Sequence, residues 1–351
     1  MPITSSLIAW YLQHKRALPW RLTQDPYRIW LSEVILQQTR VNQGINYYYR
    51  FLEAFPDVQC LAAADEQEVL KLWQGLGYYS RARNLHQTAI QVVEQHKGVF
   101  PQSAVGLKKL KGIGDYTAAA IASICFGEAV AVLDGNVMRV ISRLFAVDLP
   151  VNSSSGRKKL QAFTESLLDK ERPALFNQAV MELGALVCTP RNPACDTCPL
   201  TFACEALKCG NVTRFPVKNP SREVTTRYLN YLVINFKNKE GEYLLLRKRT
   251  GNDIWKNLYD FPCIETIQPV EFPEVLELAG KQEIFMSLPF TVSKVSREFT
   301  HQLTHRRLLT RFIEISLQNF PVIPENFIPV KNEEITSFPL PRLIELYLQQ
   351  R

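Results

Sequence analysis

The chain lacks the sequence features of secreted and membrane proteins. None of its 351 residues lies in an uncharged apolar run long enough to span a bilayer. The N-terminal stretch MPITSSLIAWYLQHKRALPW has no basic start, long apolar core or small-residue cleavage site, the three parts of a signal peptide. We therefore expect an intracellular protein without a membrane partner, located in the cytoplasm and associated with the nucleoid if bacterial.

Cysteine is also scarce, because eight cysteines in 351 residues do not make a disulfide-rich chain. Four of them nevertheless lie in one proline-rich segment, CTPRNPACDTCPLTFAC, with the spacing Cys-x6-Cys-x2-Cys-x5-Cys: Cys188, Cys195, Cys198 and Cys204. Such a segment forms loops that can aim four thiolates at one place. In a reducing compartment these are ligands more often than disulfides. Zinc and a [4Fe–4S] cluster both fit four thiolates, and the single Cys-x2-Cys pair favours the cluster.

The chain has no large charge imbalance. It carries 41 Lys and Arg against 34 Asp and Glu, a net charge of +7. This excess is only suggestive of a nucleic-acid partner.

The organisation of the chain changes near residues 205–226. Helical patterns precede this stretch, beginning with Asp25-Pro26 as an N-cap and first helical residue. Strand patterns follow it, and YLNYLVINF and EYLLLRKR flank a turn that ends in Gly241. We expect a mostly helical region over 1–215, a linker over 216–226 and an α+β domain over 227–351.

A Gly-x-Gly pair lies in the segment LKGIGDYT, at Gly112 and Gly114. Two glycines so close together suit a tight hairpin between two helices, here over about residues 104–125. The free N–H groups of the following helix would attract a phosphate, and Lys111 adds positive charge. The alternative is a plain helix–helix turn.

Two acids fit glycosidic-bond chemistry. Glu33 lies among apolar residues of a helix, where a carboxyl group can hold a proton at neutral pH. Asp134 follows the apolar run AVAVL. One such acid can protonate a leaving group while the other stabilises a sugar cation. The alternatives are a solvated helix position for Glu33 and a helix N-cap for Asp134.

Residues of about 5–215 closely resemble adenine DNA glycosylases of the MutY type, which belong to the helix-hairpin-helix, iron–sulfur glycosylase superfamily. The motifs that carry the resemblance are LPWR, WLSEVILQQTRV, GLGYYSRARNL, LKGIGDYTAAA, LDGNVMRV, FNQAVMELGALVC and the four-cysteine loop. An endonuclease III-like protein would share the hairpin and the cluster. It would carry a nucleophilic lysine where this chain has Tyr116.

The resemblance implies roles for individual residues. Glu33 would protonate an adenine that has left the base stack, Asp134 would stabilise the sugar cation, and Tyr116 would hydrogen-bond beside them. The residues that match the adenine pocket are Trp20, Arg21, Leu36 and Gln178. The residues that match the wedge into the duplex are Gln38 and Tyr78, although Tyr78 could instead pack on neighbouring helices.

Residues 227–351 resemble, more faintly, the Nudix-like domain of the same enzymes. We find no Nudix metal-binding helix in this stretch, so we expect a domain that recognises DNA without hydrolysing nucleotides. Phe299-Thr300-His301 matches a loop that contacts 8-oxoguanine in the family. The alternative is that Phe299 belongs to the core and His301 to the surface.

These patterns predict a monofunctional adenine DNA glycosylase of base excision repair with a [4Fe–4S] cluster. Its partner would be duplex DNA containing adenine opposite 8-oxoguanine or guanine, and we expect a monomer. Two alternatives stay open: an endonuclease III-like pyrimidine-lesion glycosylase with lyase activity, and a non-catalytic iron–sulfur DNA-binding module.

Overall fold

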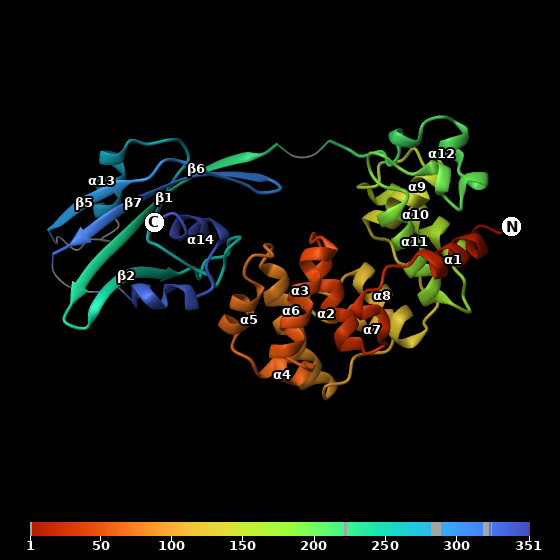
Figure 1. Ribbon diagram of the computed structural model, residues 1–351, viewed down its shortest axis with the longest axis horizontal. Coiled ribbons are helices and arrows are strands. Elements are labelled where there is room, and N and C mark those ends of the chain that lie inside the picture. Colours follow the sequence, from red (N-terminus) through yellow and green to blue (C-terminus); the bar gives the residue numbers. More distant parts are fainter. Residues whose placement is uncertain (1, 221–222, 282–288, 319–322, 324) are drawn as a thin grey trace. The chain divides into compact units, whose positions relative to one another are not determined.

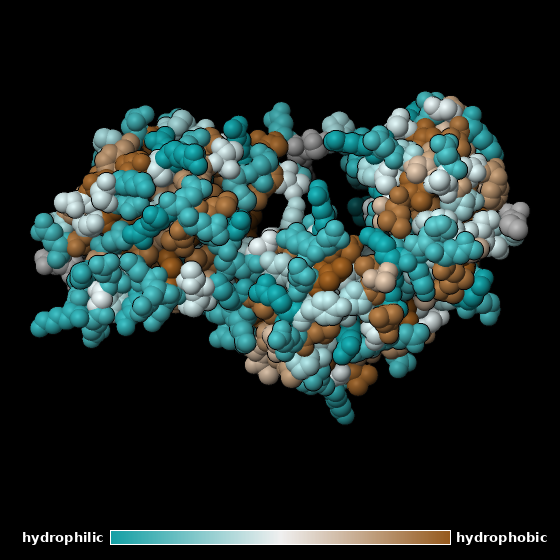
Figure 2. All heavy atoms as spheres, in the orientation of Figure 1, coloured by the Kyte–Doolittle hydropathy of each residue, from teal (hydrophilic) through white to brown (hydrophobic). Residues whose placement is uncertain are grey.

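The computed structural model describes residues 2–220, 223–281, 289–318, 323 and 325–351. The chain forms two compact units, Met1–Ala63 with Asn84–Pro220 and Ala64–Arg83 with Ser221–Arg351 (Figure 1). Hydrophilic residues cover most of the face of both units that Figure 2 shows. In the described part of the chain, no helix is both long and apolar enough to cross a membrane.

The residues that make up the second unit differ from those expected from the sequence, because residues 1–215 were expected to form one region. Residues 64–83, with α5 (Glu66–Trp73), group with the C-terminal part of the chain. The reason is a set of hydrogen bonds across large sequence separations. Lys71 Nζ donates to the Phe338 carbonyl at 3.2 Å and the Tyr79 hydroxyl to the Leu340 carbonyl at 3.3 Å. Sequence periodicity carries no signal for such contacts.

The first unit is helical and is organised around α11 (Pro173–Leu186). This helix packs against α1 (Ile3–His14), α8 (Asp115–Phe126) and α9 (Gly135–Leu144). The remaining helices of this unit include η1 (Pro19–Leu22), α2 (Pro26–Leu36), α3 (Val41–Ala54), α4 (Val58–Ala63), most of α6 (Ser80–His96), α7 (Ala104–Leu107), α10 (Ser154–Leu167) and α12 (Glu205–Lys208). At Gly184 of α11 even a Cβ would come within 2.7 Å of Asn136 Cβ. Glycine there lets α9 approach α11 closely.

Helix α2 begins as the sequence predicted. The Asp25 carboxylate accepts a hydrogen bond from the Tyr27 backbone N–H at 2.9 Å, and Pro26 is the first helical residue. Every side chain from Ile29 to Ile35 is buried, so α2 lies inside the unit rather than on its surface. Any polar residue in that stretch is therefore placed in the core.

Gly112 shapes the hairpin between α7 and α8. Its φ is +77°, and a Cβ there would come within 2.6 Å of Asn84 Cβ on α6. The backbone N–H of Lys111 donates to Gln91 Oε1 at 2.9 Å, which fastens the hairpin to the same helix. Glycine at position 112 is thus required by both conformation and space.

The second unit is built on a mixed sheet, eight-stranded in the described residues, with the order β3-β2-β1-β7-β5 and with β4, β6 and β8 beside β1, β7 and β2. Strands β1 and β7 run parallel and the other pairs are antiparallel. The bounds are β1 Thr225–Asn238, β2 Gly241–Lys248, β3 Tyr259–Asp260, β4 Cys263–Thr266, β5 Phe290–Val295, β6 Phe299–Gln302, β7 Arg306–Leu317 and β8 Phe327–Lys331. The predicted hairpin is confirmed, because β1 and β2 pair around Asn238 and Gly241.

The two faces of this sheet are covered by different helices. Val275 and Ala279 of α13 (Phe272–Lys281) pack on the aliphatic face with Leu232 and Ile313. On the other face, Tyr347 of α14 (Arg342–Leu348) stacks on Phe312 with 3.9 Å between ring centroids. A sheet with a helix on each face is the predicted α+β architecture.

Candidate active site

Glu33 and Tyr116 form the buried centre of the site. The Glu33 side chain is 8% exposed on α2, and the Tyr116 hydroxyl on α8 donates to its Oε2 at 2.5 Å. Burial raises the pKa of Glu33 to about 7; the nearby Asp134 also raises it, while the Tyr116 hydrogen bond and Arg21 oppose the shift. The solvated alternative for Glu33 is excluded, and this carboxyl group holds a proton near neutral pH.

Asp134 is both a helix cap and a neighbour of this centre. Its Oδ1 accepts a hydrogen bond from the Val137 backbone N–H at 2.7 Å, so it is the N-cap of α9, as its alternative interpretation proposed. Its Oδ2 accepts from Asn136 Nδ2 at 2.9 Å. Burial raises the pKa of Asp134 against these hydrogen bonds, and its charge raises the pKa values of both Glu33 and Tyr116. Capping and a role in the site are therefore compatible.

Glu182 on α11 is a second buried glutamate, and its pKa is shifted in the direction opposite to that of Glu33. Arg21 binds both of its oxygens at 2.9 and 2.8 Å, and Arg16 does the same at 2.9 and 2.6 Å. Burial alone would raise the pKa of Glu182, but these hydrogen bonds outweigh it and lower the pKa to about 2. An ionised Glu182 thus fixes the Arg21 guanidinium beside the site.

The other residues expected in the adenine pocket lie on η1, α2 and α11, the elements that also carry Arg21, Glu33 and Glu182. Trp20 is buried and meets the Tyr48 ring edge-on at 5.3 Å. Leu36 ends α2, half-buried, where a Cβ at Gly44 would come within 2.8 Å of its Cδ2. Gln178 is half-buried on α11, and its Oε1 accepts a hydrogen bond from the Tyr11 hydroxyl.

The two expected wedge residues share an unusual backbone conformation. Gln38, just past α2 in the first unit, has φ +56°, and Tyr78 in the second unit has φ +47°. Non-glycine residues rarely adopt this region, and such strain collects at functional sites. Tyr78 is 51% exposed, so packing does not bury it, although its hydroxyl lies 2.5 Å from the Thr304 hydroxyl.

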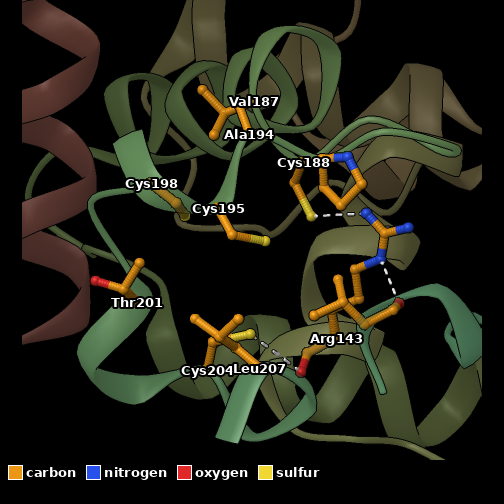
Figure 3. Close-up of a pocket in the computed structure, with 11 residues that line it drawn as sticks. Arg143, Val187, Cys188, Ala194, Cys195, Cys198, Thr201, Cys204 and Leu207 are labelled. Atoms are coloured by element: carbon orange, nitrogen blue, oxygen red, sulfur yellow. Dashed lines mark hydrogen bonds between the residues drawn. The ribbon is translucent and has the colours of Figure 1, made fainter. Parts of the chain in front are cut away.

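The four-cysteine loop forms a pocket in the first unit. Cys188, Cys195, Cys198 and Cys204 are all free thiols that line it, together with Arg143. Figure 3 shows sulfur atoms around one open space, with the Arg143 guanidinium beside Cys188. The four thiols line a space with an empty volume of about 300 Å³. Buried Arg143 donates to Cys188 Sγ at 3.3 Å, which suits a bound anionic cluster.

A chain of hydrogen bonds connects this loop to Asp134. Arg139 Nε donates to the Cys188 carbonyl at 2.7 Å, and its Nη2 donates to Asn136 Oδ1 at 2.9 Å. Asn136 in turn holds Asp134. The position of the loop is thus coupled to the position of the carboxylate.

Phe299, Thr300 and His301 do not lie on a loop, contrary to the sequence expectation. They form strand β6, which pairs with β7 from Phe299↔Thr310 to Gln302↔Arg307. The Phe299 ring packs edge-on against Phe312 at 5.3 Å, which agrees with its core alternative. Thr300 is exposed, and burial together with Arg342 lowers the pKa of the half-buried His301, so its imidazole is neutral at neutral pH.

The hairpin residues differ in how they are held. The Lys111 ammonium hydrogen-bonds to Gln87 rather than extending freely into solvent. Gly114 precedes α8 as its N-cap, is exposed, and has no atom within 4 Å of an added Cβ. Nothing in the fold of the hairpin requires glycine at position 114.

Sequence reasoning missed several residues that build the site, namely Tyr11, Arg16, Asn136, Arg139, Asn177 and Glu182. Buried Asn177 shows why. Its Nδ2 donates to the Val130 carbonyl at 2.8 Å and its Oδ1 accepts from the Val132 N–H at 3.1 Å, which holds the segment before Asp134. The available signal was a set of polar residues, Asn177, Gln178 and Glu182, inside the mostly apolar helix FNQAVMELGAL.

Comparisons with known proteins agree with this geometry. Residues 31–165 match the HhH-GPD superfamily of base excision DNA repair proteins, residues 188–204 the iron-sulfur binding domain of endonuclease III, and residues 232–350 the NUDIX domain. The adenine DNA glycosylase of Buchnera aphidicola subsp. Baizongia pistaciae is 33% identical over 92% of this chain and 88% of its own. That of Mus musculus is 46% identical over 90% and 71%. A thermostable thymine-DNA glycosylase structure superposes with a TM-score of 0.54 at 28% identity, over 59% of this chain and 95% of its own. The loop that binds the [4Fe–4S] cluster is thus the four-cysteine segment.

The two hairpin glycines generate a first prediction. Gly114→Ala should weaken binding to all DNA duplexes alike without lowering the melting temperature, because space around it is open and a methyl group would obstruct only a bound phosphate. Gly112→Ala, the matched variant, should destabilise the protein by about 1–3 kcal/mol because of its left-handed φ. Thermal unfolding and fluorescence-anisotropy titrations measure both effects. Unchanged DNA affinity in Gly114→Ala would remove that glycine from the interface.

Proposed function

The chain belongs to the adenine DNA glycosylases of the HhH-GPD superfamily, and we propose that it removes adenine opposite 8-oxoguanine or guanine by hydrolysing the N-glycosidic bond. The observation that carries this proposal is the buried Glu33, hydrogen-bonded to Tyr116, with a pKa of about 7. Such a group is protonated often enough at neutral pH to act as an acid.

Glu33 acts on the leaving base. Adenine is a poor leaving group as an anion, and a proton delivered to a ring nitrogen lets it depart neutral. The conjugate carboxylate then accepts a proton from the attacking water. Tyr116 keeps Glu33 in place, and its phenol stays neutral because burial raises its pKa well above the ordinary value. A phenol offers no amine to form a Schiff base, so the enzyme is monofunctional.

Asp134 acts on the sugar. Loss of the base leaves positive charge on the deoxyribose, and a fixed carboxylate offsets that charge in a partly buried site. The hydrogen bonds from Val137 and Asn136 orient it and oppose its protonation. Adenine reaches this position by leaving the base stack, with Gln38 and Tyr78 replacing its contacts in the duplex.

The [4Fe–4S] cluster supports this site from a distance. Cys188, Cys195, Cys198 and Cys204 would hold it through their thiolates, and it would crosslink the loop. Hydrolysis of a glycosidic bond consumes no electrons, so the role we assign to the loop is to hold Arg139 and, through Asn136, Asp134.

The second unit reads the base opposite adenine. Adenine is a normal base, so its removal must depend on its partner. Thr300 presents an exposed hydroxyl on one face of β6, and the neutral His301 imidazole, on the opposite face of the strand, both donates and accepts hydrogen bonds. The 8-oxoguanine base has an N7–H and an O8 that guanine lacks. We expect the enzyme to act as a monomer on such duplexes.

A strand-break assay tests the function. The protein should release adenine from duplexes with adenine opposite 8-oxoguanine or guanine, but not opposite thymine, and breaks should appear only after alkali. Breaks without alkali would instead support a lyase, and no breaks in any duplex would support a DNA-binding module.

The ionisation of Glu33 generates a prediction for the dependence of the excision rate on pH. Since Glu33 must be protonated, the excision rate with subsaturating DNA should fall about tenfold for each pH unit above about 7. Glu33→Gln should lower the rate about 10²–10⁴-fold at pH 7 or below and remove this dependence on pH, whereas the exposed Glu53→Gln on α3 should change neither.

Asp134→Asn separates the cap from the charge. An asparagine can still cap α9, so stability should be kept, while the rate should fall about 10²-fold or more. A variant with full activity and a lower melting temperature would leave Asp134 with the capping role alone.

The proposed recognition of the base opposite adenine predicts that variants of Thr300 and His301 discriminate less between 8-oxoguanine and guanine. Thr300→Ala and His301→Ala should each reduce the preference for 8-oxoguanine over guanine by about 0.5–1.5 kcal/mol while leaving excision opposite guanine unchanged. Thr291→Ala, exposed on the edge strand β5, is the matched control. Ratios of single-turnover rates on the two duplexes measure the effect, and full discrimination in both variants would place recognition elsewhere.

A further inference from the structure

We propose that Tyr11, a residue of α1 without an assigned role, sets how the enzyme recognises adenine by fixing the orientation of the Gln178 amide. The Tyr11 hydroxyl occupies the amide oxygen, so that the amide NH2 group is left to donate to a ring nitrogen of the extruded base. This inference rests on the proposed function and names one of its determinants of specificity.

The contact between the two residues is short and partly buried. The Tyr11 hydroxyl donates to Gln178 Oε1 at 2.5 Å, although the residues are 167 positions apart. Tyr11 is 1% exposed, and burial raises the pKa of its phenol, so the hydroxyl keeps its proton. An O–H donor at the amide oxygen turns Nε2 of Gln178 to the other side. Among the described residues, Nε2 has no hydrogen-bond partner of its own.

The position of Gln178 on α11 places it on the face that builds the site. Met181 and Glu182 follow it by three and four residues and therefore lie on the same side of the helix. The Tyr116 hydroxyl lies 3.4 Å from Met181 Sδ, and Glu182 binds Arg21. Gln178 is thus one helical turn from residues that touch the catalytic tyrosine and the pocket arginine.

Tyr11 is itself held in place by the neighbouring charges. The Arg21 guanidinium lies 5.4 Å from the centre of its ring, within the range of a cation–π interaction. Glu182 fixes Arg21, so one buried group of side chains from α1, η1 and α11 determines where the Tyr11 hydroxyl lies. A separation of 2.5 Å fits an O–H···O hydrogen bond and is shorter than an N–H···O bond, which favours the orientation with the amide oxygen toward the Tyr11 hydroxyl.

The orientation matters because adenine is asymmetric in its hydrogen bonding. Its ring nitrogens accept hydrogen bonds, whereas its exocyclic amine donates. An amide that presents NH2 reads a ring nitrogen, and an amide that presents its oxygen reads the amine. Tyr11 selects the first of these two interactions.

The test is a binding series with base analogues. The probes are duplexes whose target nucleotide carries a 2′-fluorine, which destabilises the sugar cation and keeps the base attached. The base is adenine, 1-deazaadenine, 3-deazaadenine or 7-deazaadenine, in each of which a C–H replaces one ring nitrogen. For the wild-type enzyme, we expect the analogue that lacks the nitrogen read by Gln178 to bind roughly two- to tenfold more weakly than adenine.

Two variants connect that penalty to the proposed contact. Tyr11→Phe removes only the hydroxyl and keeps the ring over Arg21. The loss of affinity for the deaza analogue, relative to adenine, should therefore shrink below twofold. Gln178→Glu keeps an acceptor for Tyr11 but has no NH2 group, so this variant should also bind the deaza analogue as tightly as adenine. Affinity for a duplex with an abasic-site analogue should stay unchanged in both, which a general loss of structure would not allow.

The outcomes separate the inference from the function on which it rests. Failure of the wild-type enzyme to excise adenine from any mispair would overturn the proposed function. Normal excision together with an unchanged series of penalties in Tyr11→Phe would overturn the inference alone. The inference would also be overturned if affinity fell when purine, which lacks the amine, replaced adenine, and did not fall when a ring nitrogen was replaced. If Tyr11→Phe does not fold, Gln178→Glu still tests whether the amide NH2 group reads the ring nitrogen, and a penalty that persists in this variant would overturn the inference.

Discussion

The burial of charge in the first unit is the constraint on which its active site depends. Two glutamates, Glu33 and Glu182, lie in one helical core, and their surroundings give them opposite ionisation. Two arginines bind Glu182 directly, which lowers its pKa to about 2 and makes it an ionic anchor. Glu33 is hydrogen-bonded by a phenol instead, and burial raises its pKa to about 7. One carboxyl group therefore organises the pocket and the other keeps a proton for chemistry. Because the difference arises from packing, any change that admits water to α2 would lower the pKa of Glu33.

Helix α11 connects the parts that maintain this arrangement. Its residues contact Tyr116 through Met181, Arg21 through Glu182 and the segment before Asp134 through Asn177. Its C-terminal end leads directly into Cys188, whose carbonyl accepts from Arg139. The iron–sulfur loop, Tyr116 and the segment before Asp134 are thus connected through one helix. The role proposed for the loop, to hold Arg139 and through it Asp134, is consistent with this arrangement.

The sequence predicted features that local patterns determine and missed those that distant contacts determine. The N-cap at Asp25, the hairpin around Gly241 and the cysteine loop each depend on residues close together in the chain. Tyr11 and Gln178 are 167 residues apart, and Lys71 and Phe338 are 267 apart, so no periodicity connects them. Strand β6 was expected as a loop because Phe299-Thr300-His301 matches a loop of the family, and its pairing with β7 decides its conformation. Glu33 could be singled out as an acid among apolar residues, but its burial follows from the packing of α2 on α8.

The most direct test of this account is the ionisation of Glu33 itself. Carboxyl carbon-13 NMR of the glutamate-labelled enzyme, with the Glu33 resonance assigned by its absence in Glu33→Gln, would follow the group through a pH titration. The account predicts a midpoint near pH 7 in the enzyme without DNA. A midpoint near 4.5, the ordinary value for a solvated glutamate, would contradict it, because Glu33 would then carry no proton to give to the base at neutral pH.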